Sequence, residues 1–149
     1  MRITVKRNIA VFSIVMMLFG VLFVGSNTVY AAGGTSDEEA VSLIMTVTEA
    51  SVKSSFGKNY SIYKKGNMVT LNLWQDGVAA GAYGVAAGLV DKKEWDNMTE
   101  TIRTSIATVL YDALEPYGVH ANVNILNDYN TDNVLVSYLD GVKVYDALE

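Results

Sequence analysis

Apolar residues recur at steps of three and four in two segments of the chain, and a capping pattern precedes each segment. Ser36-Asp-Glu-Glu39 and Asp91-Lys-Lys-Glu94 each place a capping side chain three residues before a glutamate, so that both can satisfy free amides of a first helical turn. The segments are therefore predicted to be amphipathic helices, each with one buried stripe. The stripes are Ala40, Leu43, Ile44, Val47 and Ala50 in the first helix, and Trp95, Met98, Ile102, Ile106, Val109 and Ala113 in the second.

Runs with the period of a strand follow the end of each predicted helix. Phe56-Gly57 gives the first helix a C-terminal glycine, and Pro116 with Gly118 ends the second. Apolar and polar residues then alternate, which predicts strands with one buried face. The runs are residues 60–63 and 69–74 after the first helix, and residues 121–125 and 134–139 after the second.

An Asp-Gly pair follows both sets of predicted strands. Asp76-Gly77 and Asp140-Gly141 are favoured in type I′ hairpin turns, because both central residues of that turn need positive φ. We therefore expect returning strands at Val78–Tyr83 and Val142–Tyr145. The first is rich in alanine, which favours a helix, and in glycine, which opposes one, so an early helical segment that runs into the second helix is the alternative. The uncharged stretch around it is too short to span a membrane and lacks the glycine spacing of a phosphate loop.

Together these elements predict an α+β domain. Its antiparallel sheet would have five or six strands, with the two amphipathic helices on one face. The order of helix, glycine, two strands, Asp-Gly-Val and a further strand occurs over about residues 36–83 and again over about 91–145. This order suggests two helix-plus-hairpin pseudo-repeats within a single domain of residues 32–149.

The first 31 residues have the pattern of a secretory signal peptide. Three basic residues precede an almost entirely apolar run at 9–25, and Val29 and Ala31 supply small residues at the −3 and −1 positions of a cleavage site. We expect cleavage near Ala31 or Ala32 and export to the cell envelope or the medium. An uncleaved N-terminal anchor is the alternative, because the apolar run is long for a signal peptide.

Charge and cysteine content narrow the class of partner. All 16 acidic residues but only eight of the 11 basic residues follow Ala31, which leaves residues 32–149 with a net charge of −8. Such a surface repels phosphate backbones, so nucleic acid is not an expected partner. The chain has no cysteine, which excludes disulfides, thiolate metal sites and cysteine nucleophiles. A small exported domain without disulfides is typical of bacteria rather than eukaryotes.

The spacing of the polar residues predicts no catalytic, cofactor or metal site. His120 is the only histidine and has no triad spacing around it, which predicts a surface residue on a strand. A carboxylate pair for hydrolysis is invisible in a sequence, but the acidic residues concentrate at helix starts and turns, where they have structural roles.

The loop at residues 127–133 places oxygen ligands with the opening spacing of a calcium loop, at Asp128, Asn130 and Asp132. Asn133 and Leu139 then stand where glycine and a bidentate glutamate are needed. The sequence predicts a connecting loop rich in Asx turns, with weak calcium binding as the alternative.

The aromatic residues are the best candidates for a binding surface. Strand alternation places Trp74 on the face opposite Val69, Leu71 and Leu73, so the open side of the sheet would carry it, together with Tyr63 and Tyr145. Such rings offer a large contact area at a small cost in entropy. The alternative is that Trp74 packs under the neighbouring Ala/Gly-rich strand or on the sheet edge.

These features predict an exported, non-enzymatic binding module of the cell envelope or the extracellular medium, with a protein or an envelope component as its partner. Two other classes remain open. The first is a small exported hydrolase that uses a carboxylate pair, and the second is a self-assembling structural protein of the envelope.

Overall fold

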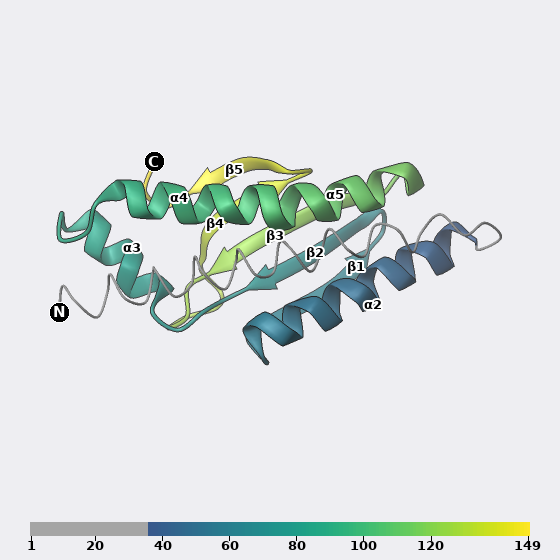
Figure 1. The fold of residues 1–149 in the computed structure, drawn as a ribbon, viewed down its shortest axis with the longest axis horizontal. Coiled ribbons are helices and arrows are strands. Elements are labelled where there is room, and N and C mark those ends of the chain that lie inside the picture. Colours follow the sequence, from purple (N-terminus) through teal and green to yellow (C-terminus); the bar gives the residue numbers. More distant parts are fainter. Residues whose placement is uncertain (1–35) are drawn as a thin grey trace.

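The fold was obtained as a computed structural model that describes residues 36–149 (Figure 1). The leader predicted at residues 1–31 lies outside the described residues. The helices are α2 (Asp37–Phe56), α3 (Val78–Ala86), α4 (Lys92–Ile102) and α5 (Thr108–Leu114), with a π-helical turn at Arg103–Ala107 and a 3₁₀ turn at Glu115–Tyr117. The strands are β1 (Tyr60–Lys65), β2 (Met68–Leu73), β3 (His120–Leu126), β4 (Val134–Leu139) and β5 (Val142–Asp146).

The five strands form one mixed sheet in the order β1-β2-β3-β4-β5. Neighbouring strands are antiparallel except for β2 and β3, which are parallel. The α+β class is confirmed, whereas the purely antiparallel sheet was wrong. Parallel neighbours need a crossover connection, and here α3, α4 and α5 supply it between β2 and β3.

The predicted strand at Val78–Tyr83 is helix α3, so the alternative reading of this stretch was correct. Gly77 has the left-handed conformation (φ 93°) and begins this helix instead of closing a type I′ hairpin. The chain therefore leaves the sheet after β2, and Figure 1 shows α3 near one end of the sheet, beside the start of α4. The two pseudo-repeats are not confirmed, because the first half lacks the third strand that the repeat required.

One apolar cluster joins the helices to a single face of the sheet. Leu71 and Val123 are register partners at the centre of that face, and both are fully buried. Residues of α2, α3, α4 and α5 all belong to the same cluster, which places the helical layer on one side. The face opposite Leu71 carries the polar positions of the strands. Within residues 36–149, no helix combines the length and apolar character that crossing a membrane requires.

The helix starts follow the sequence pattern, and the buried stripes follow it in part. Ser36 and Glu39 form the reciprocal capping box, whereas Asp91 caps α4 by accepting a hydrogen bond from the Lys93 amide. In α2 the buried face is rotated from the predicted stripe, so Leu43 is 40% exposed. The buried residues of this helix are Ala40, Val41, Ile44, Thr48, Val52 and Phe56.

A π-helical turn changes the buried face of the second helical segment. The Thr108 amide donates to the carbonyl of Arg103, five residues back, where an α-helix would use the fourth. The predicted stripe holds as far as Ile106, and the buried face then continues through Leu110 and Leu114. The predicted Val109 and Ala113 are only half-buried, because the wider turn shifts the later positions by one residue.

Candidate functional site

Two rows of side chains cross the open face of the sheet. Strand register aligns Ser61, Asn72, Asn124, Ser137 and Tyr145 as successive neighbours from β1 to β5. The adjacent row has Tyr63, Thr70, Asn122, Leu139 and Val142 in the same strand order. We call the first four residues of the first row, Ser61, Asn72, Asn124 and Ser137, the amide row. The local alternation of each strand puts these residues on the face opposite Leu71.

Hydrogen bonds link the amide row into a chain with one direction. Ser137 Oγ donates to Asn124 Oδ1 over 2.7 Å, and Asn124 Nδ2 donates to Asn72 Oδ1 over 2.9 Å. Asn72 Nδ2 then donates to Ser61 Oγ over 3.1 Å. Every donor points toward β1, so the groups polarise one another and each amide is held in one orientation. Asn122 Oδ1 joins the chain from the second row by accepting from Ser137 at 3.3 Å.

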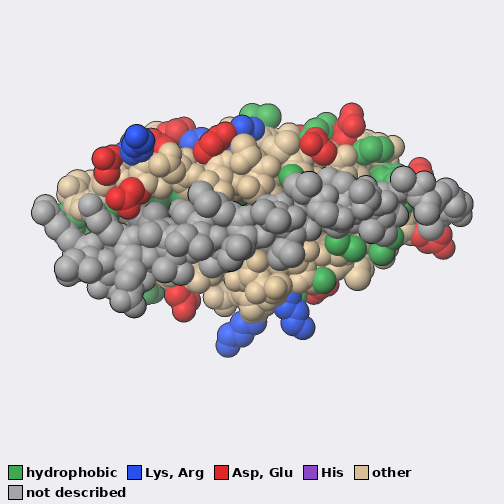
Figure 2. Space-filling model, viewed as in Figure 1, with side chains coloured by type: hydrophobic (Ala, Val, Ile, Leu, Met, Phe, Trp, Pro, Cys, Tyr) green, Lys and Arg blue, Asp and Glu red, His purple; other side chains and the backbone are tan. Residues whose placement is uncertain are grey.

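The rows contain no ionisable group except the phenols of Tyr63 and Tyr145. Their inner members Thr70 and Asn124 are buried, and Asn72 and Asn122 are half-buried. Figure 2 shows, by contrast, charged side chains of both signs over α4. The two rows therefore form an uncharged hydrogen-bonding surface on an acidic molecule. Charged groups begin in the next row, where Lys65, Met68 and His120 are register partners.

The three aromatic residues predicted as a binding surface lie around the amide row. Tyr63 on β1 is 49% exposed, and Tyr145, the register partner of Ser137 on β5, is 50% exposed. Trp74 follows the last residue of β2, where its amide donates to the carbonyl of Asn59 over 3.1 Å. Trp74 is half-buried and has the alternation phase of Asn72. A role for these residues in binding remains a prediction.

The two edges of the sheet differ in character. The β1 edge ends in the exposed Lys64 and Lys65, and lysine on an edge discourages pairing with another strand. The β5 edge instead exposes apolar side chains, with Val142 at 62% and Val144 at 57%. A register shift between Ser137 and Tyr138 bends this strand pair, as bulges commonly do at sheet edges.

His120 lies at the start of β3 and is paired with an acid. Its Nδ1 is 2.8 Å from Asp140 Oδ2, and the other carboxylate oxygen accepts from the Ala121 amide over 2.9 Å. The histidine side chain is half exposed, as its predicted surface position requires. Asp140 thereby joins the β4–β5 turn to the start of β3, which gives the pair a structural role.

The loop at residues 127–133 serves the fold in a way the sequence did not indicate. Asx turns are present, since Asn127 Oδ1 accepts from the Tyr129 amide and Asn130 Oδ1 from the Asp132 amide. Asp128 is turned away from its loop neighbours, and its carboxylate accepts from the amides of Gly77 and Ala79 at 2.8 Å each. Asp128 and Asn130, two of the three residues with the calcium-like spacing, therefore use their side-chain oxygens for different hydrogen bonds. No group of three or more His, Cys, Asp or Glu residues within 36–149 is arranged to hold a metal ion.

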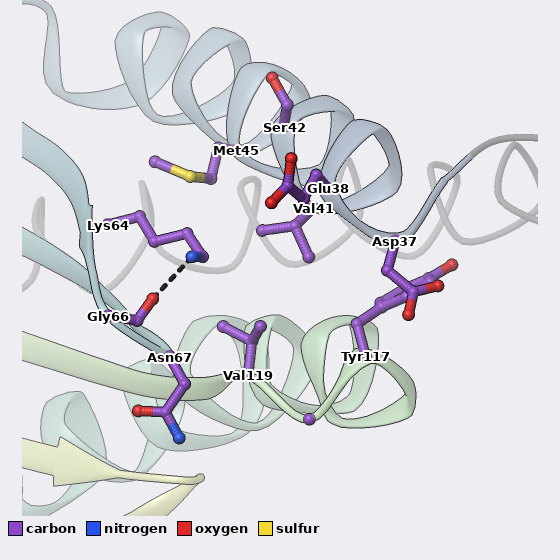
Figure 3. A pocket seen from close by; sticks show the side chains of 11 residues that line it. Asp37, Glu38, Val41, Ser42, Met45, Lys64, Gly66, Asn67, Tyr117 and Val119 are labelled. Atoms are coloured by element: carbon purple, nitrogen blue, oxygen red, sulfur yellow. Dashed lines mark hydrogen bonds between the residues drawn. The ribbon is translucent and has the colours of Figure 1, made fainter.

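A cavity of about 410 Å³ lies on another part of the molecule, between the start of α2, the β1–β2 turn and the segment before β3. Figure 3 shows Asp37 and Glu38 from α2 at its wall, with Lys64 donating to the carbonyl of Gly66 over 2.6 Å. The two carboxylates belong to consecutive residues of a first helical turn, where the positive end of the helix dipole stabilises them. They point in different directions in Figure 3, whereas a glycosidase places its two carboxylates on either side of the scissile bond.

Alternation within each strand identified the face on which the candidate residues lie but not their partners. Asn72, Asn122 and Asn124 were read only as polar positions, because the pairing of β2 with β3 that brings them together is a tertiary property. The signal that could have found them is the shared phase of asparagine in two separate strands. Comparison with family models, curated protein sequences and solved structures finds no match to this chain.

Proposed function

We propose that this chain is an exported, non-enzymatic binding module that recognises its partner through the open face of the sheet. The observation that carries the proposal is the amide row, an uncharged and internally hydrogen-bonded surface. Exposed Tyr145 continues this row on β5, and exposed Tyr63 lies on β1 in the adjacent row. Its partner is a protein or a component of the cell envelope.

Preorganisation is the physical reason for choosing this face. Side chains that must be ordered on binding reduce affinity, whereas the amide row is already held in one arrangement by its own hydrogen bonds. The flanking tyrosines add contact area with only two rotatable bonds each to immobilise. A partner that meets this face therefore loses little of its interaction energy to ordering the protein.

The carboxylates near the sheet are engaged in holding the fold together, which favours binding over hydrolysis. Asp128 caps α3, Asp140 joins His120 to a turn, and Asp146 binds Trp95. If one of these carboxylates turned to a substrate, the group that it now binds would lose its hydrogen-bond partner.

Export is the part of the proposal that rests on the N-terminal pattern alone. Expression of the full chain in a bacterial host, followed by mass measurement of the product in the medium and the envelope, tests it. Export predicts a product shortened by about 31 residues, as the cleavage pattern requires. A full-length product that remains in the cytoplasm would contradict it.

Binding is tested by cosedimentation of the purified protein with bacterial envelope fragments. Trp74→Ala and Tyr63→Ala should each weaken pelleting about tenfold or more, as expected for aromatic anchors. Tyr83→Ala is the matched control, because Tyr83 is a 65% exposed tyrosine on α3, away from the amide row. Equal loss in all three variants, or none in any, would reject the open face as the binding surface.

Self-assembly is a second candidate function, and the β5 edge is the observation that favours it. Val142 and Val144 are exposed on an edge strand that could pair with β5 of a second copy. Sedimentation velocity over a range of concentrations tests this candidate. Assembly predicts larger species at high concentration, and Val144→Lys should abolish them.

A further inference from the structure

The amide row retains hydrogen-bonding capacity after its own bonds are made. A carboxamide has two N–H groups and two oxygen lone pairs. Asn72 and Asn124 each use one N–H and one lone pair within the row. One donor and one acceptor therefore remain on each amide, in orientations that the row has already determined.

The arrangement of polar and apolar groups differs from that of a typical protein interface. Protein interfaces have an apolar centre and a polar rim. Here the centre is amide and hydroxyl, from Asn72 to Ser137, and aromatic and aliphatic side chains lie at the rim, at Tyr63 on one edge and at Tyr145 and Val142 on the other. The ligand that fits has many small polar groups along its middle and apolar surfaces that can stack on rings.

The charge of the protein disfavours anionic ligands along the amide row. The amide row has no cation to neutralise a phosphate or carboxylate, and residues 32–149 have an acidic excess that repels both. A hydroxyl group, by contrast, donates and accepts at once, so a single hydroxyl can satisfy the free N–H of one amide and the free lone pair of the next. The C–H faces of a sugar ring can pack on tyrosine and tryptophan, which are apolar on their faces and polar at one tip.

We propose that the open face binds a neutral glycan chain, which lies across the strands along the amide row from Tyr63 to Tyr145. This inference rests on the proposed binding function and names the chemical class of its ligand. Four inter-strand spacings separate β1 from β5, or about 19 Å, which suits an oligosaccharide rather than a single sugar. The half-buried Asn72 and Asn122 contact its hydroxyl groups, and the buried Asn124 orients Asn72 from within the row. Tyr63, Tyr145 and Trp74 stack on its rings.

The first experiment separates the glycan from a protein partner. Envelope fragments are treated either with protease or with periodate, which cleaves vicinal diols, and the purified protein is cosedimented with each sample. A glycan ligand with vicinal diols predicts that binding survives protease and is lost after periodate, and a glycan without them predicts that binding survives both treatments. Binding that is lost after protease and survives periodate overturns the glycan inference but leaves the proposed binding function standing. Binding to neither the treated nor the untreated fragments overturns both.

The second experiment locates the contact. Oligosaccharides released from the fragments are divided into neutral and charged pools on an anion exchanger and added to ¹⁵N-labelled protein. The neutral pool should shift the side-chain NH₂ signals of Asn72, Asn122 and Asn124. Shifts confined to other parts of the protein, or produced by the charged pool alone, overturn the inference.

Variants then connect the contact to affinity. Tyr145→Ala should weaken binding of the neutral pool about tenfold without loss of fold, because the ring is half exposed. Ser61→Ala removes the acceptor at the end of the amide row and should weaken binding about threefold while the asparagines remain. Tyr83→Ala should bind like the wild type. Wild-type affinity in both Tyr145→Ala and Ser61→Ala would reject the amide row as the glycan site.

Discussion

The indole nitrogen of Trp95 donates a hydrogen bond to the carboxylate of Asp146, 51 residues later in the chain, over 3.0 Å. Both side chains are buried, and the bond ties the first turns of α4 to the end of β5. Lys143 Nζ and the Leu148 amide also donate to this carboxylate, each over 3.0 Å. A charge buried beside the edge strand is therefore compensated by three donors.

Asp146 makes the stability of the fold depend on pH. Burial by itself raises the pKa of Asp146, but the hydrogen bonds from Leu148, Lys143 and Trp95 outweigh it and hold that pKa below the ordinary value of 3.8. A pKa that is lower in the folded state than in the unfolded state stabilises the fold at pH values above the unfolded-state pKa. This contribution is lost as the pH falls through the folded-state pKa. Asp146→Asn should therefore lose about 2 kcal/mol near neutral pH and progressively less below about pH 4.

Urea unfolding from about pH 2 to about pH 7 measures this difference. Asp132→Asn, at an exposed position of the 127–133 loop, is the control and should follow the wild type throughout. A constant gap between Asp146→Asn and the wild type over the whole range would show that the carboxylate charge is not the stabilising feature.

Leu71 and Trp74 distinguish the two faces of the sheet. Leu71 is fully buried in the core, so Leu71→Ala should cost about 2–5 kcal/mol through the cavity it leaves. Trp74 is only half-buried at the end of β2, and Trp74→Ala should cost clearly less while it weakens binding to envelope fragments. Thermal denaturation of both variants measures this. If Trp74→Ala unfolds as readily as Leu71→Ala, the tryptophan belongs to the core and not to a binding surface.

Asp128 is expected to control the local stability of α3. Asp128→Ala leaves the amides of Gly77 and Ala79 without their acceptor, which should destabilise the helix start by about 1–2 kcal/mol. Hydrogen exchange of the α3 amides reports this directly and should be faster in the variant. Asp132→Ala, in the same loop but exposed, should leave α3 protection unchanged.

Gly141 tests the packing of the β4–β5 turn against the first residue of α5, Thr108. Its φ is 76°, and an added Cβ would lie 3.0 Å from Thr108 Oγ1 and 3.1 Å from Thr108 Cα. Gly141→Ala should therefore cost about 1–3 kcal/mol more than Gly66→Ala. Gly66 is the control because its φ is also positive, at 59°, and nothing lies within 4 Å of its added Cβ. Equal losses of unfolding free energy in the two variants would contradict the close contact with Thr108.

Local chemistry in the sequence was sufficient to predict several elements. The capping box of Ser36 and Glu39 satisfies its own helix start, so it needs no distant partner. Asp140-Gly141 forms the two-residue turn between β4 and β5, and both residues have positive φ, at 51° and 76°. Strand alternation correctly put Leu71 on the buried face and Asn72 on the other.

Only the tertiary structure decided the conformation after Asp76-Gly77. The same dipeptide that makes a hairpin at Asp140 begins a helix here, because Asp128, about 50 residues later, accepts from the helix's free amides. A local pattern cannot contain that interaction. The choice of helix also required a crossover, and the crossover made β2 and β3 parallel neighbours, so the antiparallel prediction failed for the same reason.

The sequence predicted one part of the candidate site, and the tertiary structure determined the other. Sequence by itself determined which residues have the open-face phase, because strand periodicity is a property of consecutive residues. The pairing of Asn72 with Asn124 depends on strand register between segments 52 residues apart, which only the folded sheet sets. The amide row is therefore a product of tertiary structure, since its oriented hydrogen bonds exist only once four strands have aligned.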